Sequence, residues 1–186
     1  SNEVDAVWGS SITLFDLEKR GIVKIIDSTR GKDPRLTLQA HLLVTEDFEQ
    51  RYPRIVQRVV DVIVKEAAWA ADESHRDELF ALWSKAGYAV DIFAEEFRDT
   101  PLRNRVSPLL DDFFFARYRD AEKTSLELKL IRRGFEVEGW LEPKYVQSAI
   151  KRFGLEGTWP EFDAAGQPKL AAIPAGQPAS NQPASK

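Results

Sequence analysis

The sequence contains no cysteine and no methionine, and it has only two histidines. The absence of cysteine excludes disulfides, thiolate nucleophiles and cysteine-based zinc or iron sites, and it fits an oxidising or a reducing compartment equally well. The chain begins Ser1-Asn2-Glu3, without an initiator methionine or an apolar signal segment. Because residues 4–8 already resemble the middle of a sheet, we expect these 186 residues to be part of a longer protein.

An excess of basic charge is also lacking. Lys and Arg total 26 and Asp and Glu total 30, which gives a net charge of −4. A general nucleic-acid binder needs clustered basic side chains that displace counterions from phosphates, so we expect no nucleic-acid partner. No apolar run approaches the roughly 20 residues that cross a bilayer. The chain does contain 43% hydrophobic residues, among them 11 Phe, 5 Trp and 4 Tyr, which is enough for one domain with a substantial core.

The sequence offers few side chains that could bind a metal or act in catalysis. His41 and His75 lie on different expected elements, and neither has the spacing of a metal ligand. The triplet His75-Arg76-Asp77 matches the catalytic-loop triplet of protein kinases, but the chain has no glycine-rich loop and no Asp-Phe-Gly motif. The triplet therefore gives no support for a kinase.

Adjacent acids occur at Glu95-Glu96 and at Asp111-Asp112. Neighbouring positions of a helix do not face each other, so these pairs are poor acid–base dyads and are expected to be solvated. With so few converging groups, we expect a protein that is not an enzyme and that needs no cofactor and no metal.

The first 45 residues are expected to be the β part of an α/β fold. Residues 4–8 and 22–26 are short apolar runs, and residues 36–44 alternate from one side chain to the next, as in a strand. Between the first two runs, Ser10 or Ser11 is expected to cap a short helix.

Residues 45–153 are expected to be helical, because apolar side chains recur there every three to four positions. Proline suits the first turn of a helix, and glycine suits the position after the last turn. The residues placed in this way are Pro53, Ser107-Pro108 and Pro143 at helix starts, and Gly21, Gly87 and Gly154 at helix ends.

The longest of these helices begins at Pro53. Its core-facing stripe is expected to be Val56, Val59, Val60, Ile63, Ala67 and Ala70. Residues 125–133 are ambiguous, because their leucines alternate as in a strand, whereas Thr124 and Gly134 suit the two ends of a helix. We predict a helix for this segment.

From Ala164 onward the chain consists mainly of Ala, Gly, Gln, Pro and Ser, and the sequence AGQP occurs at 165–168 and again at 175–178. This composition buries too little apolar surface to offset the entropy of ordering. We therefore expect residues 164–186 to form a disordered tail.

The candidate binding site is the segment Trp8-Gly9-Ser10-Ser11. It places a small, hydroxyl-rich turn at the carboxyl end of an expected strand and the amino end of an expected helix, where backbone N–H groups favour an anion. Ligands of open α/β sheets gather at this edge. The alternative is that Ser10 only caps the helix and that Trp8 belongs to the core.

The loop over residues 28–35 is a second candidate, because Arg30, Lys32 and Arg35 bring three cations together. Such a loop can hold an anionic ligand or be an ordinary exposed turn. By itself, its composition favours the turn.

Four segments, in their order along the chain, resemble the carboxyl-terminal half of the periplasmic substrate-binding proteins of ABC importers, in the sulfonate, taurine and nitrate group. The segment EVDAVWGSS (3–11) resembles the end of the family's second-lobe strand at the ligand cleft. The segment GIVKIIDSTRG (21–31) resembles the family's next strand and its crossover toward the first lobe. The longest match is LTLQAHLLVTEDFEQRYPRIVQRVVDVIVKEAAWAAD (36–72), and the family's final helical segment is similar to VEGWLEPKYVQSAIKRFGLEGTW (137–159).

The resemblance implies an α/β architecture, namely a partial type II periplasmic-binding-protein fold with short β segments at the start and a mostly helical remainder. Residues 1–28 would end the second lobe, residues 29–35 would cross the hinge, and residues 36–163 would belong to the first lobe. The implied role is that of a periplasmic solute-binding component, which delivers a small anion such as an alkyl sulfonate, taurine or nitrate to an ABC permease in the membrane.

The resemblance also implies which residues would lie at the solute. The second-lobe wall would be lined by Trp8, Gly9, Ser10 and Ser11, and the hinge would place Thr29 and Arg30 nearby. The family often has an aromatic-acidic-Pro sequence where this chain has Trp-Gly-Ser-Ser, so the identity of the solute stays open.

The family's amino-terminal half is missing from these 186 residues, so some apolar helix faces would lack cover. We expect self-association or a partner segment to bury them. Two other interpretations remain: a protein related to the thiamine-pyrimidine synthases that share the fold, and a non-enzymatic helical interaction domain.

Overall fold

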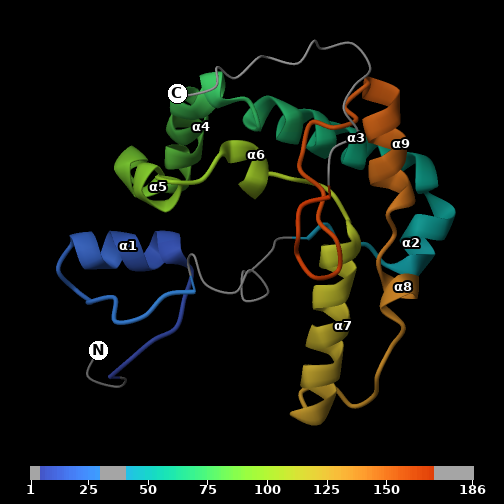
Figure 1. Cartoon of the computed structure of the whole chain (residues 1–186), viewed down its shortest axis with the longest axis horizontal. Coiled ribbons are helices and arrows are strands. Elements are labelled where there is room, and N and C mark those ends of the chain that lie inside the picture. Colours follow the sequence, from blue (N-terminus) through green and yellow to red (C-terminus); the bar gives the residue numbers. More distant parts are fainter. Residues whose placement is uncertain (1–4, 30–40, 170–186) are drawn as a thin grey trace, which may run out of the picture.

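The structure is a computed structural model, and it describes residues 5–29 and 41–169. Within those ranges the regular elements are helices, and one isolated antiparallel bridge joins Phe162 to Pro168. In chain order, with η marking a 3₁₀ turn, the elements are α1 (Ser11–Lys19), α2 (Glu46–Arg51), α3 (Pro53–Ala70), η2 (Glu73–His75), α4 (Arg76–Trp83), η3 (Ser84–Ala86), α5 (Val90–Glu96), α6 (Leu102–Arg105), α7 (Asp112–Glu127), α8 (Val137–Trp140) and α9 (Lys144–Phe153). They form an open arc, with α1, α5 and α4 on one side, α3 across the top and α9, α2 and α8 on the other side (Figure 1).

Helices α3 and α9 lie side by side and form the first of two cores (Figure 1). Its buried members are Val56, Val60, Val64, Tyr145, Ala149 and Trp159. The three valines recur every four residues, so they form one line along α3 that the apolar side of α9 covers. A polar contact fixes the register, because Gln57 Nε2 donates a hydrogen bond of 3.0 Å to the Tyr145 carbonyl.

The second core joins the end of α3 to α4, α5 and α6. Its buried members are Ala70, Leu79, Phe80, Phe93, Phe97 and Leu102. The rings of Phe80 and Phe97 lie 5.6 Å apart and those of Trp83 and Phe97 5.4 Å apart, both in tilted arrangements that aromatic pairs favour. Ile12 of α1 packs against this core from outside, so α1 is attached to the α4–α5 side of the molecule.

The predicted residues at helix starts and helix ends are largely confirmed. Pro53 is the first residue of α3, and Pro143 immediately precedes α9. Gly21, Gly87 and Gly154 have φ angles of 70°, 103° and 64°, a left-handed conformation that costs residues with a Cβ and that glycine adopts freely. These helix ends are therefore local features that the amino-acid types determine.

The α/β class and the three predicted strands are not confirmed. No strand occurs at residues 5–10, 22–26 or 41–45, and residues 36–40 lie outside the described part of the chain. Val7, Trp8 and Ile26, which we expected in buried strands, are 63%, 74% and 86% exposed. A strand needs hydrogen bonds to a second strand, and among the described residues these segments have none.

Two predictions about α7 need correction. The helix begins four residues after Pro108, because the Asp111 carboxylate accepts a 2.9 Å hydrogen bond from the Phe114 amide and caps the first turn. The predicted helix over residues 125–133 ends at Glu127, and Lys129 has a φ of 57°, which breaks the helical path. Residues 128–133 are therefore neither the strand that the alternating leucines suggested nor the helix that we predicted.

The two acidic pairs are not simply solvated, as the sequence led us to expect. Asp111 caps α7 and also accepts a 2.9 Å hydrogen bond from the Phe162 amide. Glu96 is only 4% exposed, and its Oε1 accepts a 2.6 Å hydrogen bond from Arg105. In both cases one acid of the pair accepts a hydrogen bond from a residue outside its own helix.

Helix α3 differs from its predicted stripe in one respect that matters below. Val56, Val60 and Ala70 are buried as expected, and Val64, which the prediction omitted, is fully buried. Val59 and Ile63 are instead 42% and 41% exposed. The helix therefore has two adjacent apolar faces, one of which packs on α9 while the other stays partly exposed.

The last described residues fold back on α7. Lys169 Nζ lies 2.8 Å from the Asp112 carboxylate, and the Lys169 amide donates a 2.8 Å hydrogen bond to the Glu161 carbonyl. Residues 164–169 thus differ from the disordered tail that we expected, and the rest of that tail, 170–186, lies outside the described residues. The proposed lobe and hinge boundaries at 28, 35 and 163 remain predictions.

Candidate ligand-binding site

The predicted site at Trp8–Ser11 forms the turn that leads into α1. Ser10 is the N-cap residue, with φ −68° and ψ 144°, and its side chain makes no capping hydrogen bond. Its hydroxyl lies instead 3.1 Å from the Thr13 hydroxyl, which in turn lies 3.1 Å from the Tyr88 hydroxyl. The first-turn amides of α1 are therefore not occupied by the Ser10 side chain, which leaves donors for a ligand oxygen.

The turn is open to solvent. Trp8 is 74% exposed, Gly9 and Ser10 are also exposed, and Ser11 is half-buried. The alternative in which Trp8 belongs to the core is therefore wrong. An exposed indole next to uncapped helix amides is a surface that combines an apolar plane with hydrogen-bond donors.

The other two predicted site residues are not brought to this turn. Thr29 is half-buried, and in the described residues no hydrogen bond joins it to the turn. Arg30 lies outside the described part of the chain. The structure thus brings Trp8–Ser11 together as one local unit, whereas the roles of Thr29 and Arg30 stay predictions.

Contacts with α5 and the loop before it hold this unit in place. An ion pair joins Lys19 of α1 to Asp91 of α5, and the hydrogen bond from Lys19 lowers the pKa of the Asp91 carboxyl below its usual value. At the other end of α1, Thr13 meets Tyr88, and Ile12 lies against the second core. Sequence reasoning missed Tyr88 and Asp91, because both are more than 70 residues from their partners.

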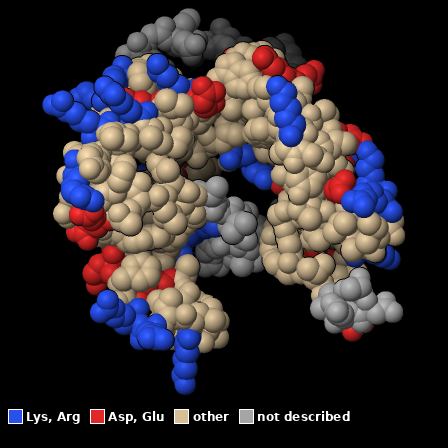
Figure 2. Space-filling model, turned by 180° about the vertical axis from the view of Figure 1, so that it is seen from behind, with Lys and Arg blue, Asp and Glu red and all other residues tan. Residues whose placement is uncertain are grey.

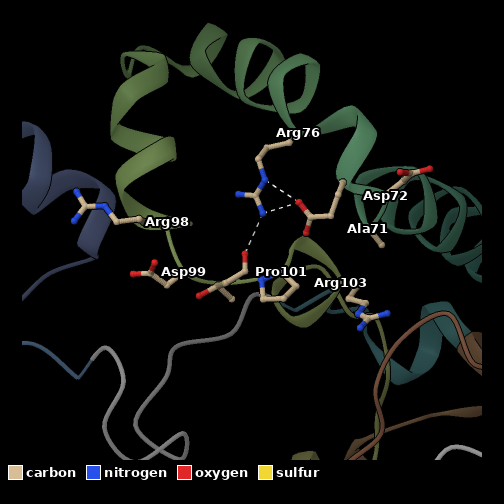
Figure 3. A pocket seen from close by; sticks show the side chains of 9 residues that line it. Ala71, Asp72, Arg76, Arg98, Asp99, Pro101 and Arg103 are labelled. Atoms are coloured by element: carbon tan, nitrogen blue, oxygen red, sulfur yellow. Dashed lines mark hydrogen bonds and ion pairs between the residues drawn. The ribbon is translucent and has the colours of Figure 1, made fainter. Parts of the chain in front are cut away.

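A separate open hollow of about 750 Å³ lies where α3, α4 and α6 meet (Figure 3). Its wall is formed by Ala71, Asp72, Glu73, Arg76, Arg98, Asp99, Thr100, Pro101 and Arg103. Three of these residues are arginines, so we compare the hollow with the predicted anion site.

The hydrogen bonds of Arg76 show that this hollow is mainly a structural junction. Its guanidinium pairs with Glu73 at 2.7 Å and donates to the Thr100 carbonyl at 3.1 Å (Figure 3). It also donates to the Phe97 carbonyl at 3.2 Å. Burial raises the pKa of Glu73, but the hydrogen bond from the Leu102 amide and the contacts of Arg76 outweigh it and lower that pKa below its usual value. Arg76 and Glu73 thus tie α4 to the segment before α6.

The rest of the hollow offers little free charge. Arg98 pairs with Glu95, and the acids Asp72, Glu73 and Asp99 offset the three arginines of the wall. Asp72 is committed to η2, because hydrogen bonds from the amide and hydroxyl of Ser74 lower the pKa of its carboxyl. A balanced, internally bonded surface of this kind gives an anion no strong preference for the hollow.

The kinase-like triplet has a structural role at the same junction. His75 Nδ1 lies 2.8 Å from the Trp69 carbonyl, and the two rings stack with centroids 4.6 Å apart. Arg76 makes the contacts described above. His75 and Arg76 of this triplet therefore stabilise the turn from α3 into α4.

Within residues 5–29 and 41–169, no three acidic or histidine side chains gather in a way that would hold a metal ion. Across the same ranges, none of the helices combines the length and the apolar character that spanning a membrane demands.

No protein-family model and no curated protein sequence matches the chain. Among solved structures, the chain is similar to one described as the periplasmic sulfonate-binding protein SsuA of a sulfonate ABC transporter, from Methylobacillus flagellatus KT. The two share 28% identity and superpose with a TM-score of 0.71, over 82% of this chain and 47% of that protein. The chain thus has the fold of part of a periplasmic binding protein and spans about half the length of the protein that it matches.

Proposed function

We propose that this chain is part of a non-enzymatic solute-binding protein of an ABC importer, and that its solute is a small anion such as an alkyl sulfonate, taurine or nitrate. The similarity to a sulfonate-binding protein, at a TM-score of 0.71, is the observation that carries the proposal. The family resemblance of segments 3–11 and 137–159 in the sequence supports it independently of the coordinates. The expected location is the periplasm, and the expected partner is a membrane permease.

The proposed anion contact is the entrance to α1. Its first-turn amides point away from the body of the helix, Ser10 leaves them uncapped, and Trp8 stands exposed beside them. An oxyanion such as a sulfonate accepts several N–H donors at once, and the positive end of the helix stabilises its charge. The alkyl part of the same solute would lie against the indole of Trp8.

The test is calorimetric titration of ethanesulfonate, taurine, nitrate and sulfate into the protein that contains this chain. We expect one of these anions to bind with micromolar or better affinity. Ser11→Pro removes one first-turn amide without disturbing the helix, because proline suits that position. Losing a hydrogen bond to a charged group is expected to weaken binding by about 10- to 100-fold.

The matched control is Ser148→Ala, which alters an exposed serine on α9 and is expected to leave affinity unchanged. Equal affinity of the Ser11→Pro and unmodified proteins would remove the α1 entrance from the site. Failure of all four anions to bind would reject the proposed solute class.

A second candidate function is a helical interaction domain with no small-molecule ligand. The large exposed apolar surface of α3 is the observation in its favour. A protein partner that binds with high affinity, together with a flat titration for every anion, would support this alternative.

A further inference from the structure

Three hydroxyl groups form a chain that leads from the α4–α5 side of the molecule to the entrance of α1. The Tyr88 hydroxyl lies 3.1 Å from the Thr13 hydroxyl, and the Thr13 hydroxyl lies 3.1 Å from the Ser10 hydroxyl. Tyr88 and Thr13 are 75 positions apart in the sequence, so only the tertiary structure brings them together. We call these three groups the hydroxyl chain.

Packing on both sides of the contact holds Tyr88 against α1. The Tyr88 ring is partly buried on the second core and meets the Phe93 ring edge-on, with centroids 6.4 Å apart. On the other side, Ile12 of α1 lies against the same core, and Lys19 forms an ion pair with Asp91. The phenol hydroxyl therefore has a defined place beside the first turn of α1.

Ser10 occupies the position from which a serine side chain ordinarily caps a helix. An N-cap serine accepts a hydrogen bond from the second or third amide of the helix, which here are the amides of Ile12 and Thr13. Ser10 has the extended backbone of an N-cap residue, yet its side chain makes no capping hydrogen bond. Within the described part of the chain, no group accepts a hydrogen bond from either amide. The Ser10 hydroxyl is thus committed to the Thr13 side chain and not to the helix backbone.

We propose that Tyr88 is a positioning residue for the α1 entrance: through Thr13, its hydroxyl holds the Ser10 hydroxyl away from the first-turn amides and keeps them free for the oxyanion of the solute. This inference rests on the proposed function and deepens it, because it names the residue that decides between two uses of the same amides. A capped helix start would satisfy these amides internally, and the solute would have to displace the Ser10 hydroxyl before it could bind. Tyr88 acts through its two neighbours and does not need to touch the solute.

A bound oxyanion also gives the hydroxyl chain one direction. Because an oxyanion only accepts hydrogen bonds, Ser10 can donate to it, Thr13 to Ser10 and Tyr88 to Thr13. Hydrogen bonds that follow one another in this way polarise and strengthen each other. The arrangement therefore favours a ligand group that has acceptors and no donor.

The availability of the amides matters because the basic side chains at the end of α1 are already paired. Lys19 forms its ion pair with Asp91, and Arg20 lies 3.3 Å from the Asp16 carboxylate. On the face of the molecule that Figure 2 shows, Lys and Arg side chains are interspersed with Asp and Glu side chains. Recognition of an anion at α1 therefore depends on main-chain amides and hydroxyl groups.

The first test is amide hydrogen exchange, measured by NMR in the absence of any anion on the protein that contains this chain. Tyr88→Phe removes one hydroxyl and leaves the sequence around α1 unchanged. We expect exchange of the Ile12 and Thr13 amides to become slower by about threefold or more, because Ser10 is then free to cap them. Loss of a contact that only supports α1 would make exchange faster, so the direction of the change separates the two roles. Adding Ser10→Ala to Tyr88→Phe is expected to restore the original rates.

The second test is calorimetric titration of the same variants with ethanesulfonate, taurine, nitrate and sulfate. Tyr88→Phe and Thr13→Val are each expected to weaken binding of the recognised anion by about 3- to 10-fold, whereas Thr13→Ser keeps the hydroxyl and should bind as the original protein does. In the Ser10→Ala background, Tyr88→Phe is expected to have no further effect, since no side chain is left to cap the helix. The matched control is Tyr52→Phe, which removes a tyrosine hydroxyl at the start of α3 and should change neither exchange nor affinity.

Unchanged or faster exchange of the Ile12 and Thr13 amides in Tyr88→Phe would overturn the inference, whether or not an anion binds. Equal affinity of Tyr88→Phe and the original protein would also overturn it, while the proposed function would stand. If none of the four anions binds, the proposed solute class fails, and slower exchange would still support the hold of Tyr88 on Ser10.

Discussion

The ion pair between the buried Glu96 and the partly exposed Arg105 allows a quantitative prediction. Glu96 is 4% exposed and its Oε2 has no hydrogen-bond partner among the described residues, so the carboxylate depends on the 2.6 Å contact with Arg105. The Arg105 guanidinium also lies over the Phe97 ring, 4.7 Å from its centroid. Arg105→Met keeps most of the packing of the side-chain stem and removes the charge.

The expected cost follows from the exposure of the two partners. Removing one partner of a fully buried pair costs about 3–5 kcal/mol, whereas an exposed pair contributes under about 1 kcal/mol. Arg105 is 39% exposed, so we place the loss of the pair between these limits, at about 2 kcal/mol. The cation–π contact adds about 0.5 kcal/mol. For a chain of this length the melting temperature would fall by about 5–10 °C.

The assay is thermal and urea unfolding of the 186-residue chain, followed by circular dichroism. Glu96→Gln removes the charge that needs a partner, so it is expected to cost only about 1 kcal/mol. The double variant is expected to lose less free energy of unfolding than the two single variants lose together, because neither charge is left without its partner. An Arg105→Met protein within about 0.5 kcal/mol of the original would show that the pair contributes no more than a surface contact.

Three further outcomes are expected from other parts of the structure. Val64→Ala, at a fully buried position of the first core, should lower the free energy of unfolding by about 2 kcal/mol in urea titrations, and a loss under about 0.5 kcal/mol would contradict the packing described. Gly154→Ala, at φ 64°, should cost about 1 kcal/mol by the same assay, whereas Gly139→Ala in α8, where no atom lies near the added Cβ, should be close to neutral. Because the pKa of Glu73 is lowered on folding, its contribution to stability is present above the unfolded value and is lost as the pH falls through the folded value. Stability measured from about pH 6 to about pH 3 should therefore fall less steeply for Glu73→Gln than for the original protein, and equal slopes would contradict this account.

The helices were predictable from the sequence where local chemistry decides their ends. Pro53 at the start of α3 and Gly87 and Gly154 after two later helix ends needed no tertiary information, because φ restrictions act within one residue. The start of α7 was missed by four residues, since Asp111 and Ser107 are both acceptable caps and only the Asp111 carboxylate also bonds the distant Phe162 amide. Local signals can thus propose several ends between which a long-range contact chooses.

The candidate site was only partly accessible to sequence reasoning. The Trp8–Ser11 turn could be recognised as a helix entrance. The structure places this turn at the surface, and the Ser10 side chain makes no capping hydrogen bond to the first turn of α1. The attachment of this turn and of α1 through Tyr88 and Asp91 could not be predicted from the sequence, because no local pattern relates residues so far apart in the chain. The exposure of Trp8 was also beyond prediction, since an aromatic residue after an apolar run suits a core as well as a ligand surface.

By itself, the amino-acid sequence determined where most helices form, which residues end them, and that cysteine chemistry is impossible, because these properties depend on residue type and on spacing along one segment. Only the tertiary structure decided which of the two apolar faces of α3 is buried, that Glu96 turns inward to Arg105, and that segment 22–26 has no strand beside it within the described residues. Burial and strand pairing are relations between distant parts of a chain, so a single segment cannot specify them without its neighbour.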